Sequence, residues 1–308
     1  MIRVSSLTKS FDGFVAVDRL SFELKSGEVL GFIGPNGAGK STTMKIITGF
    51  LAPTEGSVTI FDQDIWRTPL AAKRLIGYLP EGAPAYGDMT TRDYLRFIAE
   101  IRGFSKHERD GAIDRVVAAL SLEAVLDKRI ETLSKGFRRR VGLAQALIHD
   151  PKVLILDEPT DGLDPNQKHQ VRELIRGLSK DKIVIISTHI LEEVTALCSR
   201  VIVIADGKLV TDATPGQIEA RSRYHRAVTV ESREPELLAK LRALPGVKAV
   251  EEDQVNQRYT LIPANGQEIL PTLNQKIAEE GWAINQIYVE KGELNDVFRQ
   301  LTTTGEAA

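Results

Sequence analysis

The sequence has a single cysteine, and this scarcity limits the kinds of protein it can encode. Cys198 is the only cysteine among 308 residues, so no disulfide can form within the chain. The disulfide framework of a small secreted domain is therefore excluded, and the composition fits a reducing compartment. Cys198 stands in an apolar stretch with Val194, Leu197 and Val201. We interpret it as a small core residue and not as a nucleophile.

The chain also has no excess of charge and no long apolar run. With 40 lysines and arginines against 42 acidic residues its net charge is −2, so no general positive field favours nucleic acid. No stretch approaches about 18 consecutive apolar residues, the length expected of a membrane-spanning helix. The N-terminal sequence MIRVSSLTK lacks the apolar core of a signal peptide. We therefore expect a chain that does not itself cross a membrane.

A glycine-rich segment, Gly34–Thr42, has the sequence GPNGAGKST and fits the phosphate-binding P-loop pattern G-x-x-x-x-G-K-[ST]. It follows the short apolar stretch Glu28–Ile33, typical of a buried strand, and precedes Ser41–Thr48, which is expected to begin a helix. Glycines let backbone N–H groups close on an anion, and a helix N-terminus adds unpaired donors and a positive dipole end. Lys40 would reach the β- and γ-phosphates, and the Ser41 hydroxyl would bind Mg²⁺.

Two alternatives to a P-loop fit this segment less well. It could be an ordinary glycine-rich turn after a core strand, but the strand, loop and helix follow one another as a P-loop requires. The dinucleotide fingerprint G-x-G-x-x-G does not match glycines 34, 37 and 39. A lysine directly after the last glycine also suits a triphosphate better than a dinucleotide.

A second pattern lies at Lys152–Pro159, where the apolar run Val153–Leu156 ends in Asp157 and Glu158. In a chain with a P-loop, a hydrophobic strand that ends in two carboxylates is the Walker B pattern. Asp157 would hold Mg²⁺ through its hydration shell, and Glu158 would polarise an attacking water. Acidic pairs at strand ends are common, so the combination with the P-loop is what makes this pattern informative.

For two further candidates the residues alone leave a structural role open. His189 follows the apolar strand Lys182–Ser187, and parallel sheets bind ligands beyond the carboxyl ends of their strands. A lone histidine is nevertheless often structural. Phe11 precedes the P-loop, where an aromatic ring could stack on a purine or end a strand inside a core.

The rest of the first 220 residues contains a helical insert at residues 89–126, with amphipathic helices from near Arg92 and over Lys106–Leu120. Another helix, which follows the run Arg138–Arg140, is expected to end near His149. We interpret these arginines as a solvated helix face with one or two members near phosphate or protein. A nucleic-acid patch is the alternative.

From about residue 224 the composition changes, and the length of the chain is consistent with a second domain. The expected elements have the order β-α-β-β-α-β and a final helix, which predicts a ferredoxin-like α+β domain over residues 224–308. They are Val228–Val230, Pro235–Leu244, Val247–Val250, Tyr259–Ile262, Gln267–Glu280, Ala283–Val289 and Leu294–Leu301. No metal cluster, triad or glycine loop occurs in this part of the sequence, so we expect a regulatory, docking or dimer-stabilising role.

Taken together, residues 2–220 resemble the ATP-binding subunit of an ABC transporter. The resemblance rests on motifs in the family's order, namely Gly34–Thr42, Leu133–Phe137, Val153–Glu158, Gly162–Asp164 and His189. It implies an α/β P-loop NTPase cassette over residues 1–220, with a mixed sheet core and a helical subdomain at about residues 82–150. The tail is similar to the C-terminal extensions of bacterial export-type subunits, such as those of drug-resistance and gliding-motility-like systems.

The resemblance also implies an active site shared by two copies packed head to tail, with ATP and Mg²⁺ between them. The ATP-binding residues of one copy would be Phe11, Gly34, Pro35, Asn36, Gly37, Ala38, Gly39, Lys40, Ser41 and Thr42. The other copy would contribute the signature Leu133, Ser134, Lys135, Gly136 and Phe137, with Ser134 and the Gly136 backbone at the γ-phosphate. Glu158 and His189 would be catalytic, and Asp164 would link the two sites. The metal-binding residues would be Ser41, Glu81 and Asp157.

The sequence departs from the family pattern at a few of these positions. In the signature, Lys135 replaces the second glycine and Phe137 the usual glutamine, and a cation there is not expected to repel a triphosphate. Glu81 replaces the loop glutamine that meets Mg²⁺ and the membrane partner. A carboxylate can still bind Mg²⁺, whereas its effect on coupling stays open. Phe11 replaces a tyrosine and keeps the stacking face.

By resemblance, the chain is an ATPase subunit at the cytoplasmic face of the inner (plasma) membrane that powers a separate permease, most simply an exporter. The helical insert 89–126 and the loop Glu81–Tyr86 would meet that permease, and no nucleic-acid partner is expected. The alternative is a soluble ABC ATPase that acts on ribosomes or DNA, but those usually fuse two cassettes or carry long coiled coils. A nucleotide sensor without turnover is disfavoured by Glu158 and His189. Nothing in a cassette touches the cargo, so the sequence does not name it.

Overall fold

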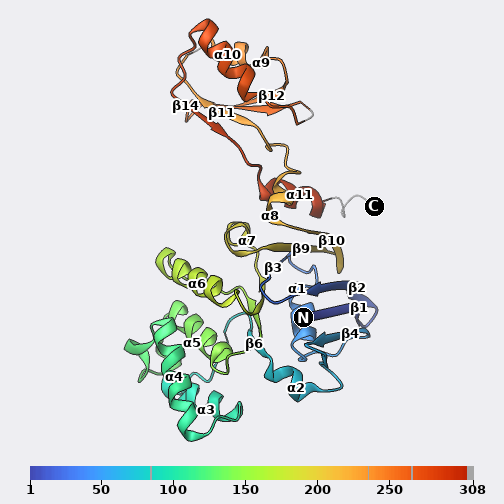
Figure 1. Cartoon of the computed structure of the whole chain (residues 1–308), viewed down its shortest axis with the longest axis vertical. Helices are drawn as coiled ribbons and strands as arrows, with labels where there is room; N and C mark the ends of the chain where they lie inside the picture. Colours follow the sequence, from blue (N-terminus) through green and yellow to red (C-terminus); the bar gives the residue numbers. More distant parts are fainter. Residues whose placement is uncertain (84, 235, 265, 304–308) are drawn as a thin grey trace. The chain divides into compact units, whose positions relative to one another are not determined.

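The computed structural model describes residues 1–303 apart from 84, 235 and 265 (Figure 1). Pro84 in the predicted loop Glu81–Tyr86, Pro235 at the start of a predicted helix, and the last five residues of the predicted second domain lie outside the described residues. The chain divides into two compact units, Met1–Thr214 and the residues from Pro215 onward.

The first unit begins with a four-stranded antiparallel sheet in the order β2-β1-β4-β5. Its strands are β1 (Ile2–Phe11), β2 (Phe14–Leu24), β4 (Glu55–Ile60) and β5 (Gln63–Asp64). β1 and β2 form a hairpin in which Phe11 pairs with Phe14 across a turn of Asp12 and Gly13. Both turn residues have positive φ, 45° and 91°, as a tight two-residue hairpin turn requires. This turn places two aromatic residues side by side at the tip of the hairpin.

The larger sheet of the first unit has six strands in the order β10-β9-β3-β8-β7-β6. The five parallel strands are β9 (Arg200–Ala205), β3 (Val29–Ile33), β8 (Ile183–Ser187), β7 (Val153–Asp157) and β6 (Ile76–Leu79). β10 (Lys208–Ala213) pairs antiparallel to β9 at the edge. β3, β7 and β8 are buried along their whole length, which explains their continuous apolar sequences. The predicted α/β cassette with a mixed sheet core is confirmed.

The carboxyl ends of four parallel strands bring the predicted motifs to one edge of this sheet. The P-loop follows β3, His189 follows β8, Glu158 follows β7 and Glu81 follows β6. Because these four strands are consecutive neighbours in the order β3-β8-β7-β6, segments from four distant parts of the sequence meet there.

Several helices of the first unit pack near the two sheets. α1 (Lys40–Ile47) contacts β2 of one sheet and β7 of the other, and its Met44, Ile46 and Ile47 are fully buried. The other helices near the sheets are α2 (Pro69–Arg74), α6 (Pro165–Leu178) and α7 (Leu191–Leu197).

Three helices pack on one another within the same unit, coloured green in Figure 1, and the last of them also contacts β6 of the six-stranded sheet. They are α3 (Thr91–Ile101), α4 (Lys106–Leu120) and α5 (Lys135–Leu147), with 3₁₀ turns at Glu123–Val125 and Ile130–Thr132 between α4 and α5. Each helix starts at a hydroxyl cap, because Thr90, Ser105 and Ser134 accept hydrogen bonds from backbone N–H groups of the first turn. These caps explain why each helix begins where it does.

The second unit contains a small antiparallel sheet in the order β12-β13-β11-β14. Its elements are α8 (Pro215–Glu219), β11 (Val228–Glu231), α9 (Leu237–Arg242), β12 (Val247–Asp253), β13 (Arg258–Pro263), α10 (Leu270–Glu280), β14 (Gln286–Val289) and α11 (Leu294–Thr303). Apolar residues of α9 and α10 share one core with β11 and β13. Over residues 228–303 the order of strands and helices agrees with the predicted order.

Of the helices that the structure describes, none combines the length and the apolar character needed to cross a bilayer.

Candidate active site

The P-loop connects β3 to α1, and two of its glycines are required by close packing. Gly39 precedes the first residue of α1 with a φ of 97°, and a Cβ there would lie 2.3 Å from the carbonyl oxygen of Ala16 in β2. A Cβ on Gly34 would lie 2.3 Å from the carbonyl oxygen of Ile204 in β9. A side chain at either position would push the loop away from these strands, so only glycine lets the helix N-terminus take its place.

Lys40 is the cation of this loop. Its Nζ donates hydrogen bonds to the carbonyl oxygens of Gly34 at 2.6 Å and Pro35 at 2.9 Å. Burial lowers the pKa of Lys40, while the nearby carboxylates Glu158 and Asp157 act in the opposite direction. The ammonium group is therefore held at the mouth of the loop, between the loop carbonyls and the carboxylates of β7.

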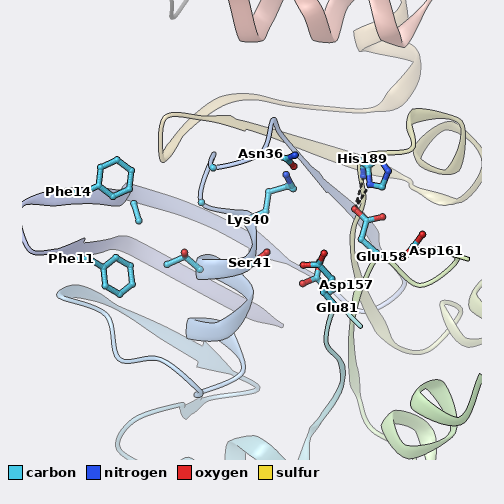
Figure 2. Close-up of a pocket in the computed structure, with 14 residues that line it drawn as sticks. Phe11, Phe14, Asn36, Lys40, Ser41, Glu81, Asp157, Glu158, Asp161 and His189 are labelled. Atoms are coloured by element: carbon cyan, nitrogen blue, oxygen red, sulfur yellow. Dashed lines mark hydrogen bonds and ion pairs between the residues drawn. The ribbon is translucent and has the colours of Figure 1, made fainter. Parts of the chain in front are cut away.

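The P-loop opens into a cleft of about 610 Å³ that collects most of the predicted residues (Figure 2). The predicted residues that line it are Phe11, Asn36, Gly37, Gly39, Lys40, Ser41, Thr42, Glu81, Asp157, Glu158 and His189. Phe14, Ala16 and Asp161 line it as well. Gly34 and Pro35 act through the carbonyls that hold Lys40, and Ala38 is buried within the loop.

Figure 2 shows how the cleft is organised along its length. Phe11 and Phe14 lie at one end, Glu158 and His189 lie at the other, and Lys40 and Ser41 lie between them. Both aromatic rings are exposed, Phe11 by 43% and Phe14 by 66%, so Phe11 does not end its strand inside a core. An elongated molecule with a flat ring at one end and phosphates at the other matches this arrangement.

The catalytic candidates Glu158 and His189 contact each other directly. Glu158 Oε1 lies 2.7 Å from His189 Nδ1 and accepts a hydrogen bond from the His189 backbone N–H at 3.0 Å. Glu158 Oε2 accepts a hydrogen bond from the Thr188 hydroxyl at 3.1 Å. The Glu158 side chain is 13% exposed and that of His189 65% exposed, so the pair reaches from the sheet into the cleft.

The backbone at Glu158 adopts an unusual conformation that a buried arginine supports. Glu158 has a φ of 52°, a left-handed value that few residues other than glycine adopt. Arg139, only 4% exposed, donates from Nη2 to the carbonyl oxygens of Asp157 and Glu158. Its Nη1 donates to the carbonyl oxygen of Pro80 at 3.3 Å. Arg139 thus links the ends of β6 and β7 beneath the Glu158 carboxylate.

In the arginine run, which was predicted to be a solvated face with one or two members near phosphate or protein, two members contact protein and only one is solvated. Arg138 is exposed, but Arg139 and Arg140 are buried. Arg140 Nη1 donates to the carbonyl oxygen of Leu120 at 3.1 Å, at the end of α4. Guanidinium groups can satisfy several carbonyls at once, which makes them suitable for such buried positions.

We expect Arg139→Met to lower the free energy of unfolding by about 2–3 kcal/mol, because buried carbonyl oxygens at the ends of β6 and β7 lose their donors. Urea unfolding followed by circular dichroism measures this change. Arg138→Met, which removes an exposed arginine from the same helix, is the control and should stay within about 0.5 kcal/mol. An Arg139→Met chain as stable as the parent would contradict the bracing role.

The five predicted signature residues lie together, but they do not line this cleft. Ser134 caps α5, accepting a hydrogen bond from the backbone N–H of Phe137 at 3.3 Å. A Cβ on Gly136 would lie 2.5 Å from Oε1 of Gln167, so the start of α5 packs closely on α6. Leu133 is buried beneath this turn. Within one chain, the signature and the P-loop are therefore separate.

Asp164 caps α6, where its Oδ1 accepts a hydrogen bond from the backbone N–H of Gln167 at 2.9 Å. Its predicted role as a link between two ATP sites stays a prediction.

Cys198 is buried, and burial raises the pKa of its thiol to about 12. A Cβ on Gly31 would lie 2.9 Å from the Cys198 sulfur, so this side chain packs against β3 as a small core residue would.

Sequence reasoning missed Phe14, Asp161 and Arg139. A signal for Phe14 was present, because the two-residue turn after Phe11 pairs these positions in a hairpin. The position of Arg139 depends on contacts with strands far away in the sequence, and no local pattern predicts them.

Comparisons with known proteins identify relatives of this chain. The ABC transporter family profile matches residues 17–161. The chain is 32% identical over 308 residues to the bacitracin transport ATP-binding protein of Bacillus licheniformis, covering 99% of this chain and 98% of that protein. It is 37% identical over 215 residues to the Nod factor export ATP-binding protein I of Sinorhizobium fredii, covering 70% of this chain and 63% of that protein. It spans 34% of the length of ABC transporter A family member 1 of Dictyostelium discoideum, with 27% identity over 297 residues and 93% of this chain.

Solved structures show the same fold. An ATP-binding subunit of an ABC transporter superposes with a TM-score of 0.67 and 28% identity, covering 72% of this chain and 92% of that one. A bacterial ABC transporter cassette solved as a dimer superposes with a TM-score of 0.64 and 25% identity, covering 70% and 99%. Through its motifs, its cleft and its relatives, the chain belongs to the ABC transporter family as one of its ATP-binding, ATP-hydrolysing subunits.

Proposed function

We propose that this chain hydrolyses MgATP at sites shared by two copies and thereby drives a separate membrane permease, most simply an exporter. The observation that carries the proposal is the separation of two halves of a site within one chain. The P-loop, Glu158 and His189 share one cleft, whereas residues 133–137 lie outside it. A second copy packed head to tail would bring its own residues 133–137 to the cleft, and a similar cassette solved as a dimer supports the pairing of two copies.

In this proposal Glu158 is the general base. Its carboxylate is oriented by the Thr188 hydroxyl and by the backbone and ring of His189. It would take a proton from the water that attacks the γ-phosphorus, while His189 holds the phosphate and the water. Lys40 would exchange its bonds to the loop carbonyls for bonds to the β- and γ-phosphates.

The cleft also fits Mg²⁺, which would be held by Ser41, Asp157 and Glu81. Burial raises the pKa of Asp157, and the neighbouring carboxylates of Glu81 and Glu158 raise it further, so a cation would stabilise this cluster. Among the described residues no group of three or more His, Cys, Asp and Glu side chains forms a metal site by itself. This suits Mg²⁺, which proteins bind with one or two carboxylates together with substrate phosphates. When bound, the ion neutralises charge on the β- and γ-phosphates.

The direction of transport is proposed from relatives. Two proteins similar to this chain are named for bacitracin transport and Nod factor export. We therefore propose export and a peripheral location at the cytoplasmic face of the inner membrane. The cargo would be selected by the permease and not by this subunit.

An apolar groove of about 480 Å³ is the proposed permease-binding surface. It lies where α2, α3 and the segment after α1 meet, and Phe50, Leu70 and Ile101 line it with exposures of 79%, 77% and 65%. Lys73 and Arg74 add positive charge, and none of the lining residues is acidic. A short amphipathic permease segment with an acidic residue would complement this surface. The groove shares α3 with the predicted insert surface and adds α2.

Leu70→Asp should reduce the membrane protein recovered with the tagged chain by at least about tenfold, because it puts a charge into the apolar groove. ATP binding, measured with a fluorescent ATP analogue, should stay unchanged. Val255→Asp is a matched control, since Val255 is 91% exposed in the second unit and lies outside the groove. Equal recovery with both variants would contradict this docking surface.

For the second unit we propose a ferredoxin-like accessory domain over residues 224–308, beside a cassette that covers residues 1–220 with its helical subdomain at about 82–150. The strand order β12-β13-β11-β14 with every pair antiparallel supports the ferredoxin-like assignment. The unit boundary after Thr214 places α8 with the second unit. The edge strand β14 exposes Ile287, Tyr288 and Val289, which suits a docking or dimer-stabilising role.

A further inference from the structure

The signature has an unusual residue, and the structure shows what this residue does within one chain. Lys135 stands where the family has a glycine, and its Nζ lies 2.8 Å from Oδ2 of Asp161. The lysine side chain crosses directly over Gly162, where a Cβ would lie 2.4 Å from Lys135 Cδ. Gly162 also has a φ of 73°, a left-handed value that a residue with a side chain adopts only with strain. The first residue of α5 is thus held against the segment that follows Glu158.

The environment of Lys135 favours an anion. A small pocket of about 210 Å³ is lined by Gly82, Ala83, Lys135, Arg138, Arg139 and Asp161. It contains three cations and one carboxylate, and it lies at the N-terminus of the 13-residue helix α5. Arg139 is 4% exposed, and its Nε has no hydrogen-bond partner among the described atoms. Asp161 is the carboxylate among the lining residues, and Asp157, Glu158 and Glu81 also act on Arg139 from outside the pocket.

Asp161 also belongs to the ATP cleft of its own chain, next to Glu158 (Figure 2). Its backbone N–H donates to the carbonyl oxygen of Glu158 at 3.2 Å. Lys135 is the main reason why the pKa of Asp161 is lowered, and Arg139 and His189 contribute to the same effect. Arg139 and His189 would therefore still stabilise the Asp161 carboxylate if Lys135 moved away.

We propose that Lys135 is a phosphate ligand. In a single chain Lys135 pairs with Asp161, and when two copies associate it exchanges this carboxylate for the γ-phosphate of the ATP bound to the second copy. The inference rests on the proposed head-to-tail dimer. The side chains of Lys135 and Asp161 are 64% and 47% exposed, so water screens their attraction. Breaking this ion pair therefore weakens dimer formation by at most about fivefold. A charge-assisted bond to phosphate in a closed interface is stronger, which favours the exchange.

The proposal predicts opposite effects for the two partners of one ion pair. Lys135→Gln removes the ligand, whereas Asp161→Asn releases it. Both are made in the full chain carrying Glu158→Gln, so that bound ATP is not hydrolysed. The fraction of dimer is measured by analytical ultracentrifugation as MgATP is increased, and ATP binding to the monomer is measured separately at low protein concentration.

Lys135→Gln should raise the dimer dissociation constant at least about tenfold, and Asp161→Asn should lower it by about threefold to fivefold. Lys106→Gln is the control for charge, since it removes an exposed cation at the start of α4 that does not line this pocket, and it should stay within about twofold. If the ion pair were only structural, Lys135→Gln and Asp161→Asn would weaken the dimer together, and that result would overturn the inference. No ATP-dependent dimer in the Glu158→Gln parent would instead overturn the proposed function, and the inference with it.

Discussion

Replacing Glu158 by glutamine is expected to lower ATP turnover by a factor of about 10² to 10⁴ while ATP still binds. The amide cannot accept the proton of the attacking water, but it keeps nearly the same shape. Its single oxygen can still accept the hydrogen bond from the His189 backbone N–H, and its NH₂ group can donate to the Thr188 hydroxyl oxygen. Phosphate release measures turnover, and equilibrium binding of a fluorescent ATP analogue measures affinity.

The control for this substitution is Glu192→Gln, which alters an exposed carboxylate on α7 only three residues beyond His189. It should hydrolyse ATP at the parental rate. If the Glu158→Gln chain also turned over at the parental rate, Glu158 would not be the base, and another group in the cleft would have to activate the water.

Lys40→Ala is expected to weaken ATP binding itself by about 10-fold to 150-fold, because charge-assisted hydrogen bonds to the phosphates are lost. The Lys40 ammonium is already positioned by the carbonyl oxygens of Gly34 and Pro35. Little additional ordering is therefore needed when it contacts a phosphate. Titration of the purified chain with the fluorescent ATP analogue measures the change in affinity.

Lys45→Ala is the matched control, because Lys45 is an exposed lysine in the same helix, one turn further from the cleft. It should leave affinity unchanged within a factor of about two. An ATP affinity that Lys40→Ala leaves at the parental value would mean that the P-loop does not bind the phosphates as described.

The predictable part of this site lies in short, contiguous motifs. The geometry of a P-loop can be predicted from its local sequence, because its glycines, its lysine and the start of its helix are adjacent in sequence. The apolar run before Asp157 likewise indicated a buried strand with two carboxylates at its end. His189 was a weaker prediction, since a single histidine after a strand can have a structural or a functional role. Its ring at 2.7 Å from Glu158 favours a functional role.

The less predictable part depends on contacts between distant segments. Nothing in the local sequence separates exposed Arg138 from buried Arg139, because only the neighbouring strand ends decide which one finds carbonyl oxygens. The order of the six-stranded sheet is non-local for the same reason. The contact between Lys135 and Asp161 joins positions 26 residues apart, so it too became visible only in the folded chain.

The central claim is that this ATPase subunit serves a separate membrane permease, and one measurement tests it most directly. The tagged full chain is purified from detergent-solubilised membranes, and its partners are identified and quantified by mass spectrometry. We expect a polytopic membrane protein at matched stoichiometry, and its loss with Leu70→Asp. Recovery of ribosomal or DNA-bound proteins, with no membrane protein, would contradict the claim and favour a soluble ABC ATPase.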